Sequence, residues 1–263
     1  MQRIEPLGGA IYYQFETWAN EPAVQHGIFT RLGGHSQAPF ATLNVGSTVG
    51  DDPRHVRANL HQIYETLGVD GKRACTVWQV HSAMCIVAER PHPTQDYLAQ
   101  ADGMITNRRG VPLIMRFADC APILLYDPVQ RAIGIAHAGW RGTVRGIAQS
   151  LVRAMQATYG TRPADLQAAI GPSISAACYQ VGEDVVQAVA QAFGTTHRLI
   201  YRAEDGSTYF DLWEANRLAL ERAGVRHIEI SGICTATRTD EFYSHRAENG
   251  KTGRFAAVFM LRE

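Results

Sequence analysis

The chain has 263 residues, of which 46% are hydrophobic and 19% are charged, and its 25 Lys and Arg residues balance 25 Asp and Glu residues. This composition is typical of a globular protein with a sizeable core, and the lack of a basic excess argues against nucleic acid as a partner. No stretch reaches the roughly 18 apolar residues of a membrane span, and the first residues lack the apolar core of a signal peptide. We therefore expect a cytoplasmic protein that does not bind membranes.

In the first half of the chain, residues 24–30 have the pattern of a strand that runs into a Gly33–Gly34 turn. A helix is expected to begin at Asp51–Asp52–Pro53, which supplies a capping carboxylate and a proline at the first helical position. Apolar residues follow at helical spacing up to Leu67, and Gly68 supplies the stop. Residues 75–80 predict a strand that ends at His81, and residues 84–88 predict another.

In the second half, residues 143–159 predict the clearest helix, which Gly160 ends. Two more amphipathic helices are expected, and short apolar segments predict six strands. Strands occur in runs as well as alternating with helices, which favours an α+β fold with mixed sheets. We find no linker or repeat, so we expect a single domain over residues 1–263. The further helices are predicted at residues 183–193 and 212–223, and the strands at residues 123–126, 132–136, 168–170, 199–201, 228–230 and 255–261.

Three candidate metal ligands lie at the edges of predicted strands. His81 ends a strand, Cys120 interrupts an apolar stretch, and His137 precedes a glycine at which a strand gives way to a helix. Two imidazoles and a thiolate suit a catalytic zinc, which keeps its fourth position open. Their spacings of 39 and 17 residues follow no local rule. Alternatively, Cys120 is a nucleophile with His137 as its base, or the three residues are unrelated.

The sequence resembles the YfiH family of laccase-domain proteins over nearly its whole length. The resemblance implies zinc bound by His81, Cys120 and His137, and a single-domain layered α/β sandwich with mixed β-sheets similar to the catalytic domain of cytotoxic necrotizing factor. It also implies phosphorolysis of adenosine, inosine, guanosine and methylthioadenosine, and deamination of adenosine. The motifs that carry it are FTRLGG (29–34), LNVG (43–46), GDDP (50–53), QVH (79–81), ADG (101–103), ADC (118–120), AHAGWRGT (136–143), IGPSIS (170–175), YQVG (179–182), Cys234–Thr235, and residues 242–246 with Gly253–Arg254.

Phosphorolysis requires a site for phosphate, and the planar fork of arginine suits that anion. Arg31, Arg141 and Arg246 are the candidates, although an arginine is more often only a solvated surface charge.

Four further residues are candidates for contacts with the nucleoside. Asp119 would protonate or orient the purine, or orient a ligand histidine, unless it only caps a turn. Asn44 would donate to the ribose, and Tyr243, like Trp140, would stack on the base. The simpler interpretation assigns Asn44 to a loop and the aromatic residues to the core.

Two other functions remain open. The resemblance also suggests a peptidoglycan editing factor that hydrolyses misincorporated cell-wall precursors. The older description as a copper-dependent polyphenol oxidase (laccase) is weaker, because the sequence has no H-x-H pair and three ligands cannot hold a four-copper centre. Copper would still compete for the same ligands. The sequence departs from the family pattern at Ser82 and in the segment Ser244–His245–Arg246–Ala247, in which one basic residue is replaced. We expect a monomer or a small homo-oligomer.

Overall fold

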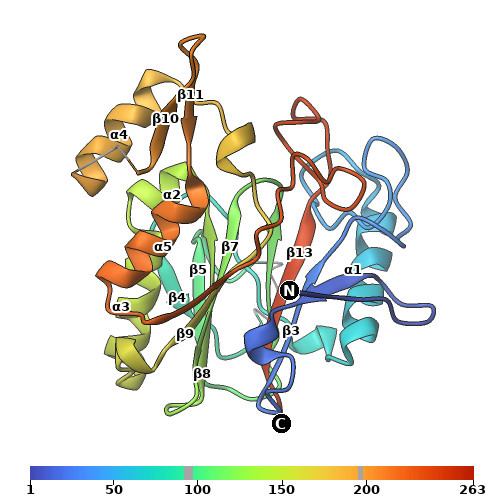
Figure 1. Ribbon diagram of the computed structural model, residues 1–263. Helices are drawn as coiled ribbons and strands as arrows, with labels where there is room; N and C mark the ends of the chain where they lie inside the picture. Colours follow the sequence, from blue (N-terminus) through green and yellow to red (C-terminus); the bar gives the residue numbers. More distant parts are fainter. Residues whose placement is uncertain (92–96, 195–197) are drawn as a thin grey trace.

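The structure is a computed structural model that describes residues 1–91, 97–194 and 198–263. Two β-sheets dominate it (Figure 1). The first is antiparallel, with strands in the order β1 (Gln2–Ile4), β2 (Tyr12–Gln14), β3 (Val24–Phe29), β13 (Phe255–Leu261) and β6 (Leu113–Phe117). The second is mixed, with strands in the order β12 (His227–Ile230), β9 (Gln167–Ile170), β7 (Ala121–Asp127), β8 (Ala132–Ala138), β5 (Gly103–Thr106) and β4 (Cys85–Val87).

The two sheets pack face to face, and helices cover their outer faces. Aromatic residues of the first sheet meet aliphatic residues of the second in one buried cluster. The helix α1 (Pro53–Leu67) lies on the outer face of the first sheet, and α3 (Ile147–Tyr159) and α5 (Leu212–Arg222) cover the second. The remaining elements are α2 (Trp140–Val144), α4 (Glu183–Phe193), β10 (Ile200–Arg202), β11 (Thr208–Phe210), and the 3-10 helices Glu16–Trp18, Gly71–Arg73, Pro163–Asp165 and Ala176–Cys178. This layering confirms the expected α+β fold with mixed sheets.

Local sequence signals hold where they are strongest. The side chain of Asp52 accepts a hydrogen bond from the backbone N–H of Arg54 at 2.8 Å and so caps α1. Gly68 ends the same helix at a φ of 65°, a conformation that glycine adopts without the strain of a Cβ. Among the described residues, no helix combines the length and the apolar character needed to cross a membrane.

Three predicted elements were wrong. The helix predicted over residues 143–159 is two helices, because Gly146 has a φ of 83° and breaks it between α2 and α3. Residues 75–80 form no strand and make only isolated bridges at Cys75 and Trp78. His137 does not follow a strand but lies within β8. The last two corrections bear directly on how the candidate ligands are held.

His26 predicts a loss of stability at acid pH. Its ring is buried against Phe15, Trp18 and Phe259, and its Nε2 accepts the backbone N–H of Phe15 at 2.8 Å. Burial lowers the pKa of His26 from 6.5 to about 4, so the unfolded chain binds a proton in this interval that the folded chain does not. The free energy of unfolding should therefore fall by about 3 kcal/mol between pH 6.5 and 4 on account of His26.

Urea denaturation of the wild type and of His26→Gln at several pH values measures this effect. The wild type should lose more stability than the variant as the pH falls. Parallel pH profiles for the two proteins would rule out His26 as the source.

Candidate metal centre in a basic cavity

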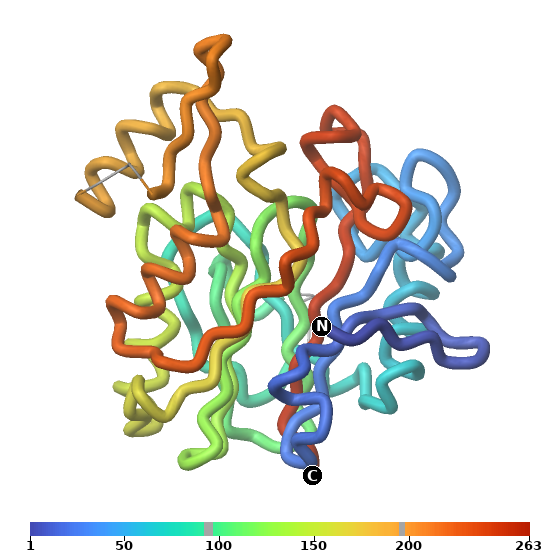
Figure 2. The backbone as a smooth tube through the Cα atoms, in the orientation of Figure 1, coloured from blue at the N-terminus to red at the C-terminus, as the bar shows by residue number. Residues whose placement is uncertain are grey.

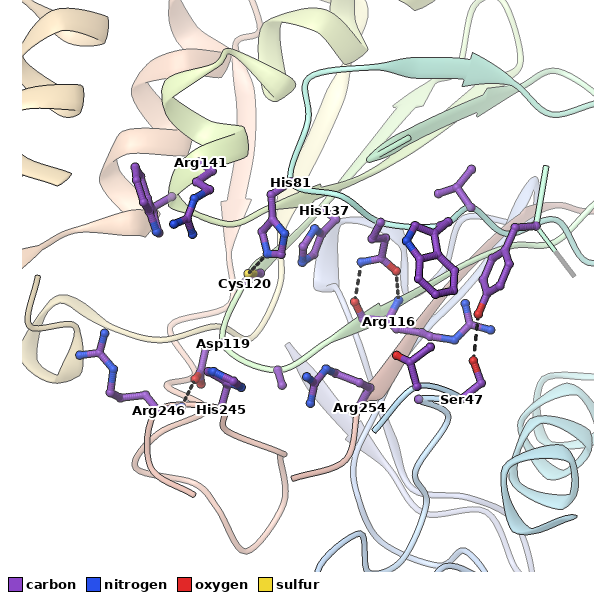
Figure 3. Close-up of a pocket in the computed structure, with 18 of the residues that line it drawn as sticks. Ser47, His81, Arg116, Asp119, Cys120, His137, Arg141, His245, Arg246 and Arg254 are labelled. Carbon is purple, nitrogen blue, oxygen red and sulfur yellow. Dashed lines mark hydrogen bonds between the residues drawn. The ribbon is translucent and has the colours of Figure 1, made fainter. Parts of the chain in front are cut away.

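His81, Cys120 and His137 converge in the structure, although they are distant in the sequence (Figure 3). Their ligand atoms lie within 4.8 Å of one another. Cys120 Sγ is 4.0 Å from His81 Nε2, which is less than the sum of a Zn–S bond of about 2.3 Å and a Zn–N bond of about 2.0 Å. The donor set and its spacing therefore fit a single metal ion that contacts all three side chains.

The second sheet brings these residues to one edge. Cys120 directly precedes β7, whose Pro122 pairs with His137 of β8. Asp102 directly precedes β5, whose first residue pairs with the residue before His137. Strand pairing alone therefore places Cys120, His137 and Asp102 side by side at the end of three neighbouring strands.

Asp102 connects two of the candidate ligands. Its buried carboxylate accepts backbone N–H groups of Val80, His81 and Ser82 at 3.1, 3.0 and 2.6 Å, and the hydroxyl of Ser82 at 2.8 Å. Its Oδ1 also lies 2.9 Å from Nδ1 of His137. A carboxylate on Nδ1 holds a histidine in the tautomer that presents Nε2 to a metal. Although its motif was recognised, Asp102 was not predicted as a site residue, because only the fold reveals these contacts.

Two left-handed backbone positions turn the ligand segments toward the cavity. His81 has a φ of 59° and Asp119 has a φ of 80°, values that are rare for residues with a Cβ. The carbonyl of His81 accepts a hydrogen bond from Arg145 Nη1 at 2.7 Å, and the carbonyl of Asp119 accepts the backbone N–H of Ile174 at 3.0 Å. Such backbone strain persists only where the surroundings hold it, and it is concentrated at functional sites.

Mutual contacts shift the pKa values of Cys120, His137 and Asp102. Burial raises the pKa of Cys120, but the imidazoles of His137 and His81 outweigh it and lower the pKa to about 6. Burial lowers the pKa of His137, but Cys120 and Asp102 outweigh it and raise the pKa to about 9. Burial also raises the pKa of Asp102, yet hydrogen bonds from His137 and Ser82 lower it to about 2. Cys120 is therefore ready to act as a thiolate, the form that binds metals.

Gly139 leaves room for the cluster. A Cβ at this position would lie 2.6 Å from Cys120 Sγ and 3.2 Å from Cδ2 of His81. The first distance is too short for any side chain. Gly139 is therefore required because Cys120 Sγ approaches its backbone closely, and not because of its backbone conformation.

A cavity of about 520 Å³ opens beside the metal ligands. Arg141, Arg246 and Asp119, which were predicted as site residues, line it. Trp140, named as a candidate for stacking on the base, lines it too. Tyr179 and Arg254 lie in motifs of the family resemblance but were given no role, and Arg116 lies outside every one of those motifs. The full lining is Gly46, Ser47, Thr48, Val77, Trp78, Gln79, His81, Tyr97, Arg116, Ala118, Asp119, Cys120, His137, Trp140, Arg141, Tyr179, His245, Arg246 and Arg254.

Asp119 lines this cavity, but both of its oxygens have partners. Oδ1 accepts the hydroxyl of Thr235 at 2.7 Å, and Oδ2 accepts the backbone N–H of Arg246 at 2.6 Å. The carboxylate therefore anchors the C-terminal loop that carries Arg246 into the cavity.

Arg31, Asn44 and Tyr243, which were predicted to bind substrate, do not line the cavity. Arg31 donates to the carbonyls of Ala41 and Thr239 and pairs with Glu248, and its guanidinium lies 4.4 Å from the centroid of the Tyr243 ring. The Tyr243 ring is fully buried, and its hydroxyl donates to a backbone carbonyl.

Asn44 is likewise occupied inside the protein. It donates to Asp51 Oδ2 at 2.8 Å and accepts the backbone N–H groups of Gly46 and Arg254, each at 2.8 Å. Figure 2 shows the two loops that these contacts join, residues 31–50 and 239–254, lying side by side. The three residues hold these loops together behind the cavity.

A family model, two curated relatives and a solved structure all place similar proteins in one family. Residues 25–262 match the family model described as multi-copper polyphenol oxidoreductase laccase. The purine nucleoside phosphorylase YlmD of Bacillus subtilis is 36% identical over 256 residues, which cover 94% of this chain and 92% of YlmD. A purine nucleoside phosphorylase of Deinococcus radiodurans is 41% identical over 239 residues, which cover 91% of this chain and 90% of the relative. The crystal structure of YlmD from Geobacillus stearothermophilus is similar with a TM-score of 0.91 at 36% identity, over 99% of both chains.

Proposed function

The chain belongs to the laccase-domain family that includes YlmD and YfiH, and on that premise we propose that it is a zinc-dependent purine nucleoside phosphorylase. Its substrates would be adenosine, inosine, guanosine and methylthioadenosine with inorganic phosphate, and adenosine deamination would be a second activity. The observation that carries the proposal is the His81–Cys120–His137 cluster in the wall of a cavity lined by arginines.

Zinc is a metal that this donor set suits. His81, Cys120 and His137 would bind it and leave a fourth position open, as in other catalytic zinc sites. When bound, the metal would supply a Lewis acid and lower the pKa of a coordinated water. Copper binds nitrogen and sulfur ligands more tightly than zinc, so laccase-like oxidation would reflect copper in the same site.

Arg141 and Arg246 are suited to hold inorganic phosphate. Their guanidinium carbons lie 4.4 Å from the centroid of the Trp140 ring and 5.2 Å from the centroid of the Tyr179 ring, respectively. Stacking on an aromatic face orients a guanidinium while it leaves N–H groups free for an anion. In phosphorolysis, a phosphate oxygen attacks C1′ of the ribose, the C1′–N9 bond breaks, and its electron pair leaves with the purine. The base then takes up the proton that phosphate gives up.

Chromatography of inosine and adenosine after incubation with zinc-loaded protein tests the proposal. Hypoxanthine or adenine, together with ribose 1-phosphate, should form only when phosphate is present. Formation of inosine from adenosine without phosphate would report the deaminase activity. Removal of zinc by a chelator should abolish both reactions. Nucleosides that survive unchanged in every condition would contradict the assignment.

A further inference from the structure

The cavity carries more positive charge than one inorganic phosphate needs. Four arginines line it (Arg116, Arg141, Arg246 and Arg254), and in the part of the chain that the structure describes none of them has a carboxylate ion-pair partner. The carboxylate of Asp119 already accepts two hydrogen bonds. Two guanidiniums suffice to bind a phosphate dianion through paired hydrogen bonds. A second pair therefore remains without a carboxylate ion pair among the described residues, although the Asp119 carboxylate and the Cys120 thiolate line the same cavity.

Two of the four arginines come from neighbouring strands, because Arg116 of β6 pairs with Ala256 of β13 and Arg254 directly precedes β13. In Figure 3, Arg141 and Arg246 are drawn to the left of the His81–Cys120–His137 cluster, and Arg116 and Arg254 are drawn to the right of it and below it. The members of each pair come from separate segments of the chain. Two separate basic groups along one cavity suit a ligand set with two separate anionic groups.

Hydrogen bonds to the protein hold the second pair in place. Arg116 donates from Nε to the carbonyl of Val45 at 2.8 Å and from Nη1 to the hydroxyl of Thr76 at 2.9 Å. Arg254 donates from Nη1 to the carbonyls of Thr252 and Gly253 at 3.1 and 2.8 Å. These bonds fix both guanidiniums before a ligand arrives, which reduces the entropy lost on binding.

The same bonds leave donors of both arginines open. Among the described residues, Nε and Nη2 of Arg254 have no hydrogen-bond partner, and they form one edge of the guanidinium, the geometry that binds an oxyanion with two parallel hydrogen bonds. Nη2 of Arg116 likewise has no hydrogen-bond partner among the described residues. Ser47 and Thr48 line the cavity too, and the hydroxyl of Ser47 lies 2.9 Å from that of Tyr97.

We propose that Arg116 and Arg254 form a subsite for an anionic group carried by the nucleoside itself, so that the substrates include purine nucleoside 5′-monophosphates. This inference rests on the proposed phosphorylase function and deepens it. A volume of about 520 Å³ is within the range of pockets that enclose ligands of this size. Arg141 and Arg246 then hold inorganic phosphate, and the second pair holds the 5′-phosphate.

The reaction with such a substrate balances without any further reagent. Inosine 5′-monophosphate and hydrogen phosphate give hypoxanthine and ribose 1,5-bisphosphate. The C1′–N9 bond breaks with its electron pair on N9, a C1′–O bond to phosphate forms, and the proton of hydrogen phosphate passes to the base. No oxidant or reductant takes part.

Calorimetric titration with inosine 5′-monophosphate and with inosine tests the subsite. The wild type should bind the monophosphate at least about tenfold more tightly than inosine, since each charge-assisted hydrogen bond contributes on the scale of a tenfold change in affinity. This advantage should shrink at high salt. Arg254→Gln and, separately, Arg116→Gln should remove most of it, and the remote surface variant Arg108→Gln should keep it. Circular dichroism checks that each variant is folded.

Three results would overturn the subsite. The wild type could bind the two ligands equally well, or the tighter binding of the monophosphate could survive in both Arg254→Gln and Arg116→Gln. It could also be lost only in Arg141→Gln and Arg246→Gln.

Phosphorolysis of inosine and of the monophosphate is measured in a separate assay. If inosine is phosphorolysed but the bound monophosphate is not, the monophosphate is no substrate and the proposal fails. If inosine is untouched while monophosphate binding depends on Arg254, the phosphorylase function fails and the anion subsite stands.

Discussion

Cys120→Ala should lose bound metal and lower phosphorolysis by about a thousandfold or more, because a catalytic metal contributes several kcal/mol to stabilising the transition state. Cys120 is the only sulfur among the three candidate ligands, and the imidazoles of His81 and His137 keep it in the thiolate form. Two histidines alone are a poor site for zinc.

Metal content, measured by mass spectrometry, and the rate of inosine cleavage test this prediction together. Cys178→Ala is the matched control, since Cys178 is partly exposed and does not line the cavity, and it should keep both metal and activity. Stoichiometric zinc in Cys120→Ala would refute the ligand assignment. If Cys120→Ala is inactive but the wild type works equally well after chelation, Cys120 acts instead as a nucleophile with His137 as its base.

Asp102→Asn should lower metal affinity by about 10- to 100-fold, the usual cost of removing the group that orients a ligand histidine. It should also destabilise the fold by about 3 kcal/mol, because a buried network of charged hydrogen bonds is broken. Val80 and Ser82 donate their N–H groups to Oδ2, whereas His81 donates to Oδ1, so an amide nitrogen at either position removes part of this set. Both the position of His81 and the tautomer of His137 would be disturbed.

Competition with a zinc-binding dye measures the affinity, and urea denaturation of the metal-free protein measures the stability. Asp205→Asn offers a matched control, since Asp205 lies in an exposed turn far from the cavity lining. An Asp102→Asn protein with unchanged affinity for zinc would show that Asp102 supports the backbone without tuning the metal ligands.

The sequence predicts some elements almost to the residue. The helix α4 begins at Glu183 and ends at Phe193, and the strand β13 covers residues 255–261, both as expected. In α1, the capping Asp52, Pro53 and the Gly68 stop are local signals, and the apolar face of the helix meets the first sheet. These elements were predictable because their propensity, capping and hydrophobic pattern agree.

Elsewhere tertiary contacts overrode the local pattern. Residues 75–80 alternate like a strand, but they lead directly into the left-handed turn at His81 and pair only through isolated bridges. The break at Gly146 splits the segment that reads as one helix and lets α2 and α3 pack separately. A periodic pattern reports which face is buried, and it does not report where the chain must turn.

For the site, the sequence by itself determined the chemical types: two histidines and a cysteine in motifs typical of one family, with arginines among the conspicuous residues. Tertiary structure decided which of them meet. Pairing of β5, β7 and β8 brings Asp102, Cys120 and His137 together. Loop packing takes Arg31 out of the cavity, and antiparallel pairing of β6 with β13 brings Arg116 and Arg254 into it. Metal and anion binding depend on distances of a few ångströms between groups far apart in the chain, and only the packed sheets set those distances.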